Sequence, residues 1–220
     1  MGQVLLVRHG QASFGAADYD VLSETGWVQA RALGSWLAAR GIVADVVLSG
    51  EMRRQRDTAT ALAEAAGWSV EPAVDAGWNE FDHRAVVTAY GGAPDTVDRA
   101  AFQAAFTAAL EEWIAGEPGD VPESFPGFVK RVGAALTRAC AGAGPAATVV
   151  VSSSGGPVAA ACAALLDPDR PSAERGGLWT RLNTVIVNGS CSRIVVGSTG
   201  PRLLTFNEHE HLTEGLRTYR

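Results

Sequence analysis

The stretch Val4-Leu5-Leu6-Val7-Arg8-His9-Gly10 decides the fold class of this protein. It opens with an unalternating aliphatic run, which is typical of a central strand buried on both faces. A helical pattern then begins after Ser23 and ends at Gly41. Residues 46–48 predict a second short strand, which is followed by an arginine-rich helix that ends at Gly67. Strand and helix therefore alternate, and this order predicts a parallel sheet.

The second half of the chain extends this pattern. Residues 148–151 resemble the first strand and lead through Ser152-Ser153-Ser154-Gly155-Gly156 into an alanine-rich helix. Residues 184–187, the turn dipeptide Asn188-Gly189 and residues 194–196 predict a hairpin, and residues 201–206 predict a further strand. We therefore expect a three-layer α/β/α domain with a mostly parallel central sheet and antiparallel additions at one edge.

The chain length and the local composition predict one domain. The 220 residues, at roughly 150 per domain, fit a single domain over 1–220. Between residues 75 and 127, glycine- and proline-rich pieces interrupt helical ones, and we interpret this span as a helical insertion, or cap, over the site. Loop-rich segments of this kind often determine substrate specificity.

Charge and composition exclude several partners. The net charge of -6 and the pI near 5.2 argue against non-specific nucleic-acid binding, which needs a basic face. The apolar runs are far shorter than the roughly 20 residues that span a bilayer, so no membrane association is expected. Cys140, Cys162 and Cys191 lack metal-site spacing and are expected to be buried, reduced thiols of a cytoplasmic protein. Exposed edge residues after Thr184 leave a homodimer open.

Polar residues follow the predicted strands where a ligand would bind. In open parallel sheets, ligands bind outside the carboxyl ends of the strands, so Arg8, His9, Arg54 and the serine-glycine run should converge there. Arginine offers a planar fork that matches phosphate oxygens, and glycine lets the backbone approach closely. An imidazole whose tautomer is fixed is nucleophilic near neutral pH, so His9 is a candidate to accept a phosphoryl group. A surface histidine beside a solvated arginine is the competing interpretation of the tripeptide alone.

Four ordered motifs resemble those of the histidine phosphatase superfamily, which includes the cofactor-dependent phosphoglycerate mutases. They are Leu6-Val7-Arg8-His9-Gly10-Gln11, Leu22-Ser23-x-x-Gly26-x-x-Gln29-Ala30, the stretch from Ser49 to Ala59, which is similar to S-S-P-L-x-R-A-x-Q-T-A, and Phe206-Asn207-x-x-x-His211-Leu212. Trp78-Asn79-Glu80-Phe81-Asp82-His83 resembles the family segment that carries the general acid. The resemblance spans nearly the whole chain.

The resemblance implies a role for each matching residue. His9 would be the nucleophile and Glu80 the general acid, although Asp82 lies close enough to compete for that assignment and Glu80 as a solvated loop carboxylate remains the alternative. Arg53 and Arg56 fall at variable positions and are expected on a charged helix face. His83 and His209 receive no role, His211 is expected to serve structure, and a zinc site at His209 and His211 is a poor match. The phosphate would be bound by Arg8, Gln11, Arg54, Ser154 and Gly155.

The chain departs from the family at one position. Ser154 stands where family members usually have a second histidine on the phosphate. A hydroxyl can still donate a hydrogen bond, and the Gly155 amide at a helix N-terminus favours anions, but neither supplies positive charge. Losing a charge-assisted contact costs about 1–2 kcal/mol, which predicts a slower enzyme and a gain in turnover for Ser154→His.

The expected activity is hydrolysis of a small phosphorylated metabolite through phosphohistidine on His9, with no metal or cofactor. A mutase must keep its phosphoenzyme while the substrate reorients, and the missing cation makes this harder. Phosphoglycerate mutase-type phosphoryl transfer, and a phosphate-binding regulatory module that has lost turnover, remain the alternatives. A nucleotide-binding transferase has little support, because neither glycine-rich nucleotide motif occurs.

Overall fold

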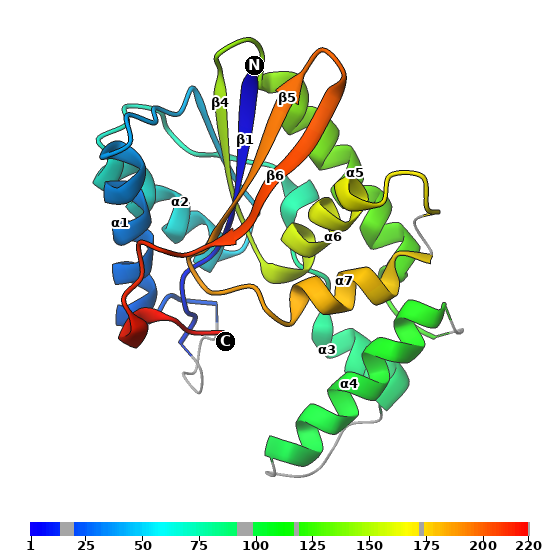
Figure 1. Cartoon of the computed structure of the whole chain (residues 1–220). Coiled ribbons are helices and arrows are strands. Elements are labelled where there is room, and N and C mark those ends of the chain that lie inside the picture. The colour runs from blue at the N-terminus through cyan, green and yellow to red at the C-terminus, as the bar shows by residue number, and fades with distance from the viewer. Residues whose placement is uncertain (14–19, 92–98, 117–118, 172–173, 220) are drawn as a thin grey trace.

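The computed structural model describes residues 1–13, 20–91, 99–116, 119–171 and 174–219. Within these ranges, six strands form one mixed sheet in the order β3-β2-β4-β1-β5-β6 (Figure 1). β1 to β4 pair in parallel, whereas β5 and β6 are antiparallel additions, as expected from the sequence. The strands are β1 (Gly2–Arg8), β2 (Val46–Ser49), β3 (Ala73–Val74), β4 (Thr148–Ser153), β5 (Cys191–Gly197) and β6 (Gly200–Glu208).

Helices cover both faces of the sheet and confirm the predicted three-layer arrangement (Figure 1). On one face, α1 (Glu24–Ala38) and α2 (Arg53–Ala66) pack against Leu5 and Val7, and on the other, α5, α6 and α7 pack against Val4 and Leu6. Alternate β1 residues thus enter two separate cores, because side chains alternate along a strand. The other helical segments are η1 (Ala76–Trp78), α3 (His83–Val86), the π-helical η2 (Val87–Gly91), α4 (Arg99–Ala115), α5 (Phe125–Gly142), α6 (Gly155–Leu166), α7 (Gly176–Asn183) and η4 (Glu214–Leu216).

The helix boundaries follow the capping residues seen in the sequence. The Ser23 side chain accepts a hydrogen bond from Gly26 N and caps the start of α1. Gly67 ends α2 with φ of 70°, in the left-handed region that favours glycine. α2 itself begins at Arg53, shortly after the last residue of β2, so its first turn lies at the carboxyl edge of the sheet.

The predicted hairpin around Asn188-Gly189 is wrong. The hairpin is formed instead by β5 and β6, and residues 184–187 connect α7, which the sequence did not predict, to β5. The backbone groups of this connection are already bonded elsewhere: Val187 N donates to the Asn207 side chain, and Ile186 O accepts from Arg8. They are therefore not available to a strand ladder, whatever the β propensity of the residues.

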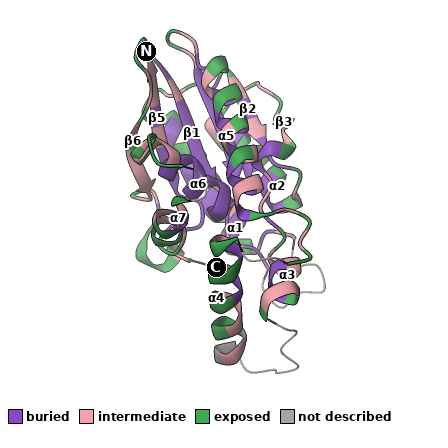
Figure 2. Ribbon diagram, turned by 90° about the vertical axis from the view of Figure 1, so that its right-hand side faces the viewer, coloured by how far each residue is buried: buried purple, intermediate pink, exposed green. Residues whose placement is uncertain are grey.

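The span from residue 75 to 127 contains η1, α3, η2 and α4 and extends into α5. Figure 2 shows α4 projecting away from the sheet, with much of its surface exposed or half-buried. A cluster of aromatic rings at the sheet end of this span fixes it to α5 and α7, with ring centroids of Phe81 and Phe128 5.6 Å apart and those of Phe81 and Trp179 5.9 Å apart. Phe81 therefore holds the neighbouring Glu80 against the body of the protein.

The cysteines agree only partly with the expectation. Cys162 and Cys191 are buried, and burial raises the pKa of each thiol to about 12, so both are protonated. Cys140, near the C-terminal end of α5, is only half-buried and packs against the core. Across the described ranges, every helix is too short or too polar for a membrane span.

Candidate active site

The candidate site lies at the carboxyl ends of β1, β2 and β4, at the lower end of the sheet in Figure 1. β1 and β4 run side by side until Arg8 pairs with Ser153, and His9 N then donates to Ser153 O at 2.8 Å. The chain leaves β1 at His9 and leaves β4 at Ser154. The topology of the parallel sheet thus brings together residues more than a hundred positions apart.

His9 is almost fully buried, with 6% of its surface exposed, and both ring nitrogens are engaged. Its Nδ1 lies 2.7 Å from Gly10 O, and because a carbonyl only accepts, Nδ1 carries the proton. Nε2 is then the unprotonated nitrogen, and it accepts a hydrogen bond of 3.0 Å from Arg54 Nε. Burial, and then the nearby Arg54 and Arg8 guanidinium groups, lower the pKa of His9 well below 6.5. The ring is a neutral imidazole with a lone pair on Nε2.

Arg54 is equally buried and enters the site from the first turn of α2. Its Nη1 forms an ion pair with Asp20 at 2.8 Å, and the same carboxylate accepts from Arg53 N at 2.8 Å. Asp20 therefore occupies the position of an N-cap side chain, which Met52 cannot supply. The sequence reasoning missed Asp20, because an acidic residue in a loop carries no local signal of a contact across more than thirty residues.

Arg8 lies at the same edge of the sheet, but two of its guanidinium nitrogens donate to backbone carbonyl groups. It donates to Ile186 O through Nη1 and to Tyr219 O through Nη2, the latter at 3.1 Å. A Cβ built on Gly155 would lie 3.7 Å from Arg8 Nε, so the guanidinium lies next to the first residue of α6. The structure thus brings Arg8 and Gly155 together, as expected from the motifs.

Glu80 is placed against the N-terminus of α6. Its Oε2 accepts from Gly156 N at 3.1 Å and its Oε1 from Phe81 N at 3.2 Å. Burial raises the pKa of Glu80, although the two amides and the charges of Arg54 and Arg8 oppose this shift. A raised pKa keeps the carboxyl protonated to a higher pH, as a proton donor requires. A Cβ on Gly156 would collide with this carboxylate, so a larger residue there would displace the Glu80 side chain.

Asp82, the competing acid, has another role. Its Oδ1 accepts from Arg84 N and Ala85 N, each at 3.0 Å, and so caps α3. A carboxylate that accepts from the first amides of a helix is turned towards that helix. The geometry therefore favours Glu80 over Asp82 as the acid.

Ser154 is buried, with 1% of its surface exposed, at the N-cap of α6. Its hydroxyl oxygen accepts a hydrogen bond of 2.8 Å from Gln55 Nε2. Gln55 has no exposed surface and was missed by the sequence reasoning, which treated it only as part of the motif. The signal was present: Gln55 stands at the alanine position of the S-S-P-L-x-R-A motif, just as Ser154 stands at the histidine position.

Gln11 does not reach this cluster through its side-chain carbonyl. Its Oε1 accepts from Ser23 Oγ at 2.9 Å, and its N–H donates to Gln29 Oε1 at 2.8 Å. These bonds connect the loop after His9 to the start of α1. The phosphate-binding role of Gln11 stays a prediction, since these bonds involve only its side-chain carbonyl and its backbone N–H.

His209 and His211 each form a hydrogen bond to a backbone carbonyl. His209 Nδ1 lies 2.6 Å from Asn207 O, and His211 Nε2 lies 2.9 Å from Gly189 O. Among the residues described, no group of three or more metal-binding side chains is arranged to hold an ion. His211 thus connects the segment after β6 to Gly189, next to the carbonyl groups of Arg8 and His9 that Gly189 N contacts.

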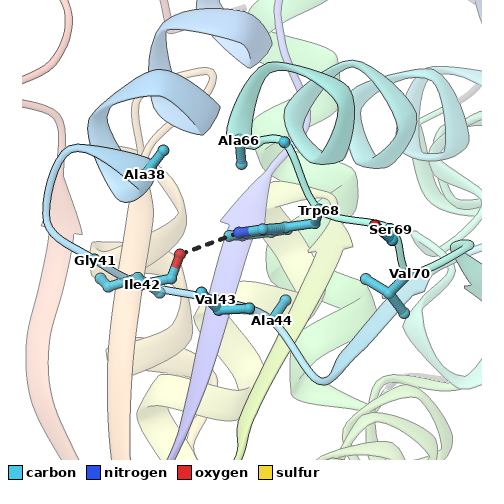
Figure 3. Close-up of a pocket in the computed structure, with 10 residues that line it drawn as sticks. Ala38, Gly41, Ile42, Val43, Ala44, Ala66, Trp68, Ser69 and Val70 are labelled. Carbon is cyan, nitrogen blue, oxygen red and sulfur yellow. Dashed lines mark hydrogen bonds between the residues drawn. The ribbon is translucent and has the colours of Figure 1, made fainter.

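A hollow of about 510 Å³ lies elsewhere, between the ends of α1 and α2 (Figure 3). In it, Trp68 Nε1 donates to Ile42 O at 3.0 Å. Its lining has no ionisable side chain, so it offers none of the chemistry that the sheet edge provides. The lining residues are Ala38, Gly41, Ile42, Val43, Ala44, Ala66, Gly67, Trp68, Ser69 and Val70.

Solved structures with the same fold are known. A mycobacterial glucosyl-3-phosphoglycerate phosphatase in complex with inorganic phosphate is 25% identical with a TM-score of 0.66, and 97% of this chain and 100% of that chain are covered. A phosphoserine phosphatase mutant from Entamoeba histolytica in complex with phosphoserine is 18% identical with a TM-score of 0.67, covering 97% and 100%. A putative α-ribazole-5'-P phosphatase from Escherichia coli is 21% identical with a TM-score of 0.63, covering 97% and 99%.

A sequence search among curated proteins found no match. The family model of the histidine phosphatase superfamily (branch 1), in contrast, matches residues 4–209, which include β1, His9, Glu80 and Ser154. A match over this length covers the sheet and every residue of the cluster at its edge. The protein therefore belongs to the histidine phosphatase superfamily and is an enzyme of the phosphatase type.

Proposed function

We propose that the protein hydrolyses a small phosphorylated metabolite through a phosphohistidine intermediate on His9. The observation that carries this proposal is the state of the imidazole: Nδ1–H is bonded to Gly10 O, the pKa is lowered, and Nε2 has its lone pair next to Arg54. A neutral, oriented imidazole beside cationic groups is suited to attack a phosphorus atom.

In the first step, His9 Nε2 forms a bond to phosphorus while the bond to the ester oxygen breaks. Arg54 and Arg8 stabilise the negative charge on the transferred oxygens, with the Gly155 amide and the Ser154 hydroxyl as neutral donors. The Arg54 Nε–H, which now faces Nε2, would turn to a phosphoryl oxygen when the substrate binds. The ester oxygen leaves with the proton of Glu80, whose raised pKa supports this role.

In the second step, a water molecule attacks the phosphorus of phosphohistidine. Glu80, now a carboxylate, accepts a proton from that water, and the bond between phosphorus and Nε2 breaks. Inorganic phosphate leaves and His9 returns to its neutral form. One group thus acts first as acid and then as base, as microscopic reversibility allows.

The proposed substrate class rests on the cationic side chains Arg8 and Arg54 at the site and on similar solved structures. Three similar solved structures are named as phosphatases of a glucosyl-3-phosphoglycerate, of phosphoserine and, as a putative enzyme, of an α-ribazole 5'-phosphate, all small phosphate monoesters. We propose that residues 75–127 act as a cap that determines which monoester enters. Within it, His83 and Phe106 contact each other with ring centroids 6.5 Å apart, next to the segment that carries Glu80.

A phosphate-binding module with little or no turnover is the second candidate. One observation favours it: Arg54 Nε–H occupies the lone pair of His9 Nε2, and a hydroxyl at Ser154 replaces a cation. The presence of Glu80 favours the enzyme, because a module that only binds phosphate has no use for a proton donor.

The experiment that separates the two compares wild type with His9→Ala on 4-nitrophenyl phosphate. The reaction is quenched into base, where phosphohistidine survives, and the protein is analysed by mass spectrometry. We expect wild type to release phosphate and to carry an acid-labile phosphoryl group, and His9→Ala to do neither. Phosphate binding by wild type without release or adduct would support the module instead.

A further inference from the structure

The side chain of Gln55 connects α2 to the residue that begins α6. Its Nε2 donates to Ser154 Oγ at 2.8 Å and to Trp78 O at 3.3 Å, and its Oε1 accepts from Met52 N at 3.3 Å. The two backbone partners have fixed roles, since a carbonyl only accepts and an N–H only donates. They therefore determine which end of the carboxamide faces Ser154, and it is the NH2 end.

This orientation determines where the Ser154 proton can go. An amide NH2 group only donates, so the Ser154 oxygen must accept, and its own proton must point to another partner. The hydroxyl does not cap α6, although it stands at the N-cap position. No acceptor for this proton is found among the described residues.

The neighbouring serines are different. Ser152 Oγ donates to Gln55 O at 2.8 Å, and Ser153 Oγ donates to Trp78 O at 2.7 Å. All three serines are buried at the same strand end, but only Ser154 stands at the N-cap of α6, directly before the residues that lie beside Arg8 and Glu80. The residues that follow it are Gly155, beside Arg8 Nε, and Gly156, whose N–H is bonded to Glu80.

We propose that Gln55 is a positioning residue for the phosphoryl site: by donating to the Ser154 oxygen, it keeps the Ser154 proton available for a phosphoryl oxygen. This inference rests on the proposed function, because it assumes that the anion binds between His9 and the N-terminus of α6. Without Gln55, the hydroxyl is free to rotate and can donate to Trp78 O, which Gln55 and Ser153 now share. In wild type, Gln55 and Ser154 together would then take the place of the second histidine that the family motif leads one to expect at position 154.

A double-mutant cycle tests this inference. The variants are Gln55→Met, which keeps the side-chain volume but has no donor, Ser154→Ala, and both together. For each, kcat and KM on 4-nitrophenyl phosphate and the Kd for orthovanadate are measured, with thermal unfolding to confirm folding. Ser152→Ala is the matched control, because it removes a buried hydroxyl that is bonded to the main chain of Gln55 and not to its side chain.

We expect each single change to lower kcat by roughly 10–100-fold, the value of one hydrogen bond to a charged group, with a smaller effect on KM. In the Ser154→Ala background, Gln55→Met should add less than about three-fold, because the group it positions is gone. Ser152→Ala should lower the unfolding temperature and leave the effect of Gln55→Met unchanged. The same coupling should appear in the Kd for vanadate.

Additive losses in the cycle, or full kcat in Gln55→Met, would overturn the inference. If Gln55→Met does not fold, Gln55→Glu takes its place in the cycle: it keeps the shape and turns the donor into an acceptor for the Ser154 proton. If wild type releases no more phosphate than His9→Ala, the proposed function fails, and the vanadate cycle still decides the role of Gln55. Failure of wild type to bind vanadate as well would overturn both.

Discussion

Arg54 Nε donates a hydrogen bond of 3.0 Å to His9 Nε2, so the guanidinium that would bind the phosphate holds the proposed nucleophile before the substrate arrives. The bond requires an unprotonated Nε2, because two N–H groups cannot face each other. It therefore adds to the effect of burial in lowering the pKa of His9. The ring is thus oriented and kept neutral by the same residue.

The first prediction concerns the dependence of kcat/KM on pH. A His9 pKa below 6.5 means that the nucleophile stays unprotonated in mildly acidic solution, and a raised Glu80 pKa means that the acid stays protonated there. Activity should therefore rise as pH increases through the pKa of His9 and fall as pH increases through that of Glu80. Initial rates on an alkyl phosphate across pH will check this, and Arg54→Met should move the rising limb towards 6.5.

The second prediction concerns Glu80→Gln. It should lower kcat by about 10²–10⁴-fold on an alkyl phosphate, whose leaving oxygen needs a proton, and much less on 4-nitrophenyl phosphate, whose leaving group does not. Steady-state rates and trapping of the phosphohistidine check this, with Asp82→Asn as the control because Asp82 caps α3. Equal losses on the two substrates would argue against Glu80 as the acid.

The third prediction concerns Asp20, whose carboxylate accepts from Arg53 N and pairs with Arg54. Asp20→Ala should destabilise the protein by about 1 kcal/mol, as the loss of an N-cap does. Asp20→Asn should destabilise the protein by only roughly a few tenths of a kcal/mol, because an asparagine side chain also accepts from the helix amide. The ion pair itself contributes little, since the Asp20 carboxylate is partly exposed. Urea unfolding of the three proteins measures this, and equal stability of Asp20→Ala and wild type would contradict it.

The fourth prediction concerns His211, whose pKa is lowered from 6.5 to about 4, chiefly by burial. The unfolded chain binds a proton on this residue below pH 6.5, whereas the folded chain does not until about pH 4. Stability should therefore fall as pH decreases across this window. His211→Gln, which keeps a donor for Gly189 O, should unfold with a shallower loss in the same window, measured against wild type by thermal unfolding. An unchanged slope would show that other groups cause it.

The fifth prediction concerns Ser154→His, for which the sequence alone predicts a gain in turnover. Because Gln55 Nε2 lies 2.8 Å from Ser154 Oγ, an imidazole in the serine's rotamer would occupy the place of the carboxamide. Ser154→His alone should not raise turnover, whereas Gln55→Ala with Ser154→His should raise it above that of either single variant. Comparison of kcat for the four proteins checks this, and a gain from Ser154→His alone would show that the space is already present.

The sequence determined the architecture and the chemical identity of the site. Buried strands and capped helices are encoded by local patterns, since an aliphatic run such as that before Arg8 cannot be solvated and Ser23 satisfies the amides of the helix that it begins. The order of strand and helix then implies that His9 and Ser154 meet, because parallel strands end at the same edge. The candidates His9 and Arg54 were placed in this way, whereas Glu80 was named only through the resemblance of its segment to that of the family.

Only the tertiary structure decided which contacts these residues make. The residues 184–187 have strand propensity, but their backbone groups are bonded to Arg8 and Asn207, so a hairpin does not form. Asp20 reaches Arg54, and Gln55 reaches Ser154, across loops whose paths no local pattern encodes. Hydrogen-bond partners far apart in the chain depend on side-chain packing over the whole fold, whereas propensity and periodicity extend over only a few residues.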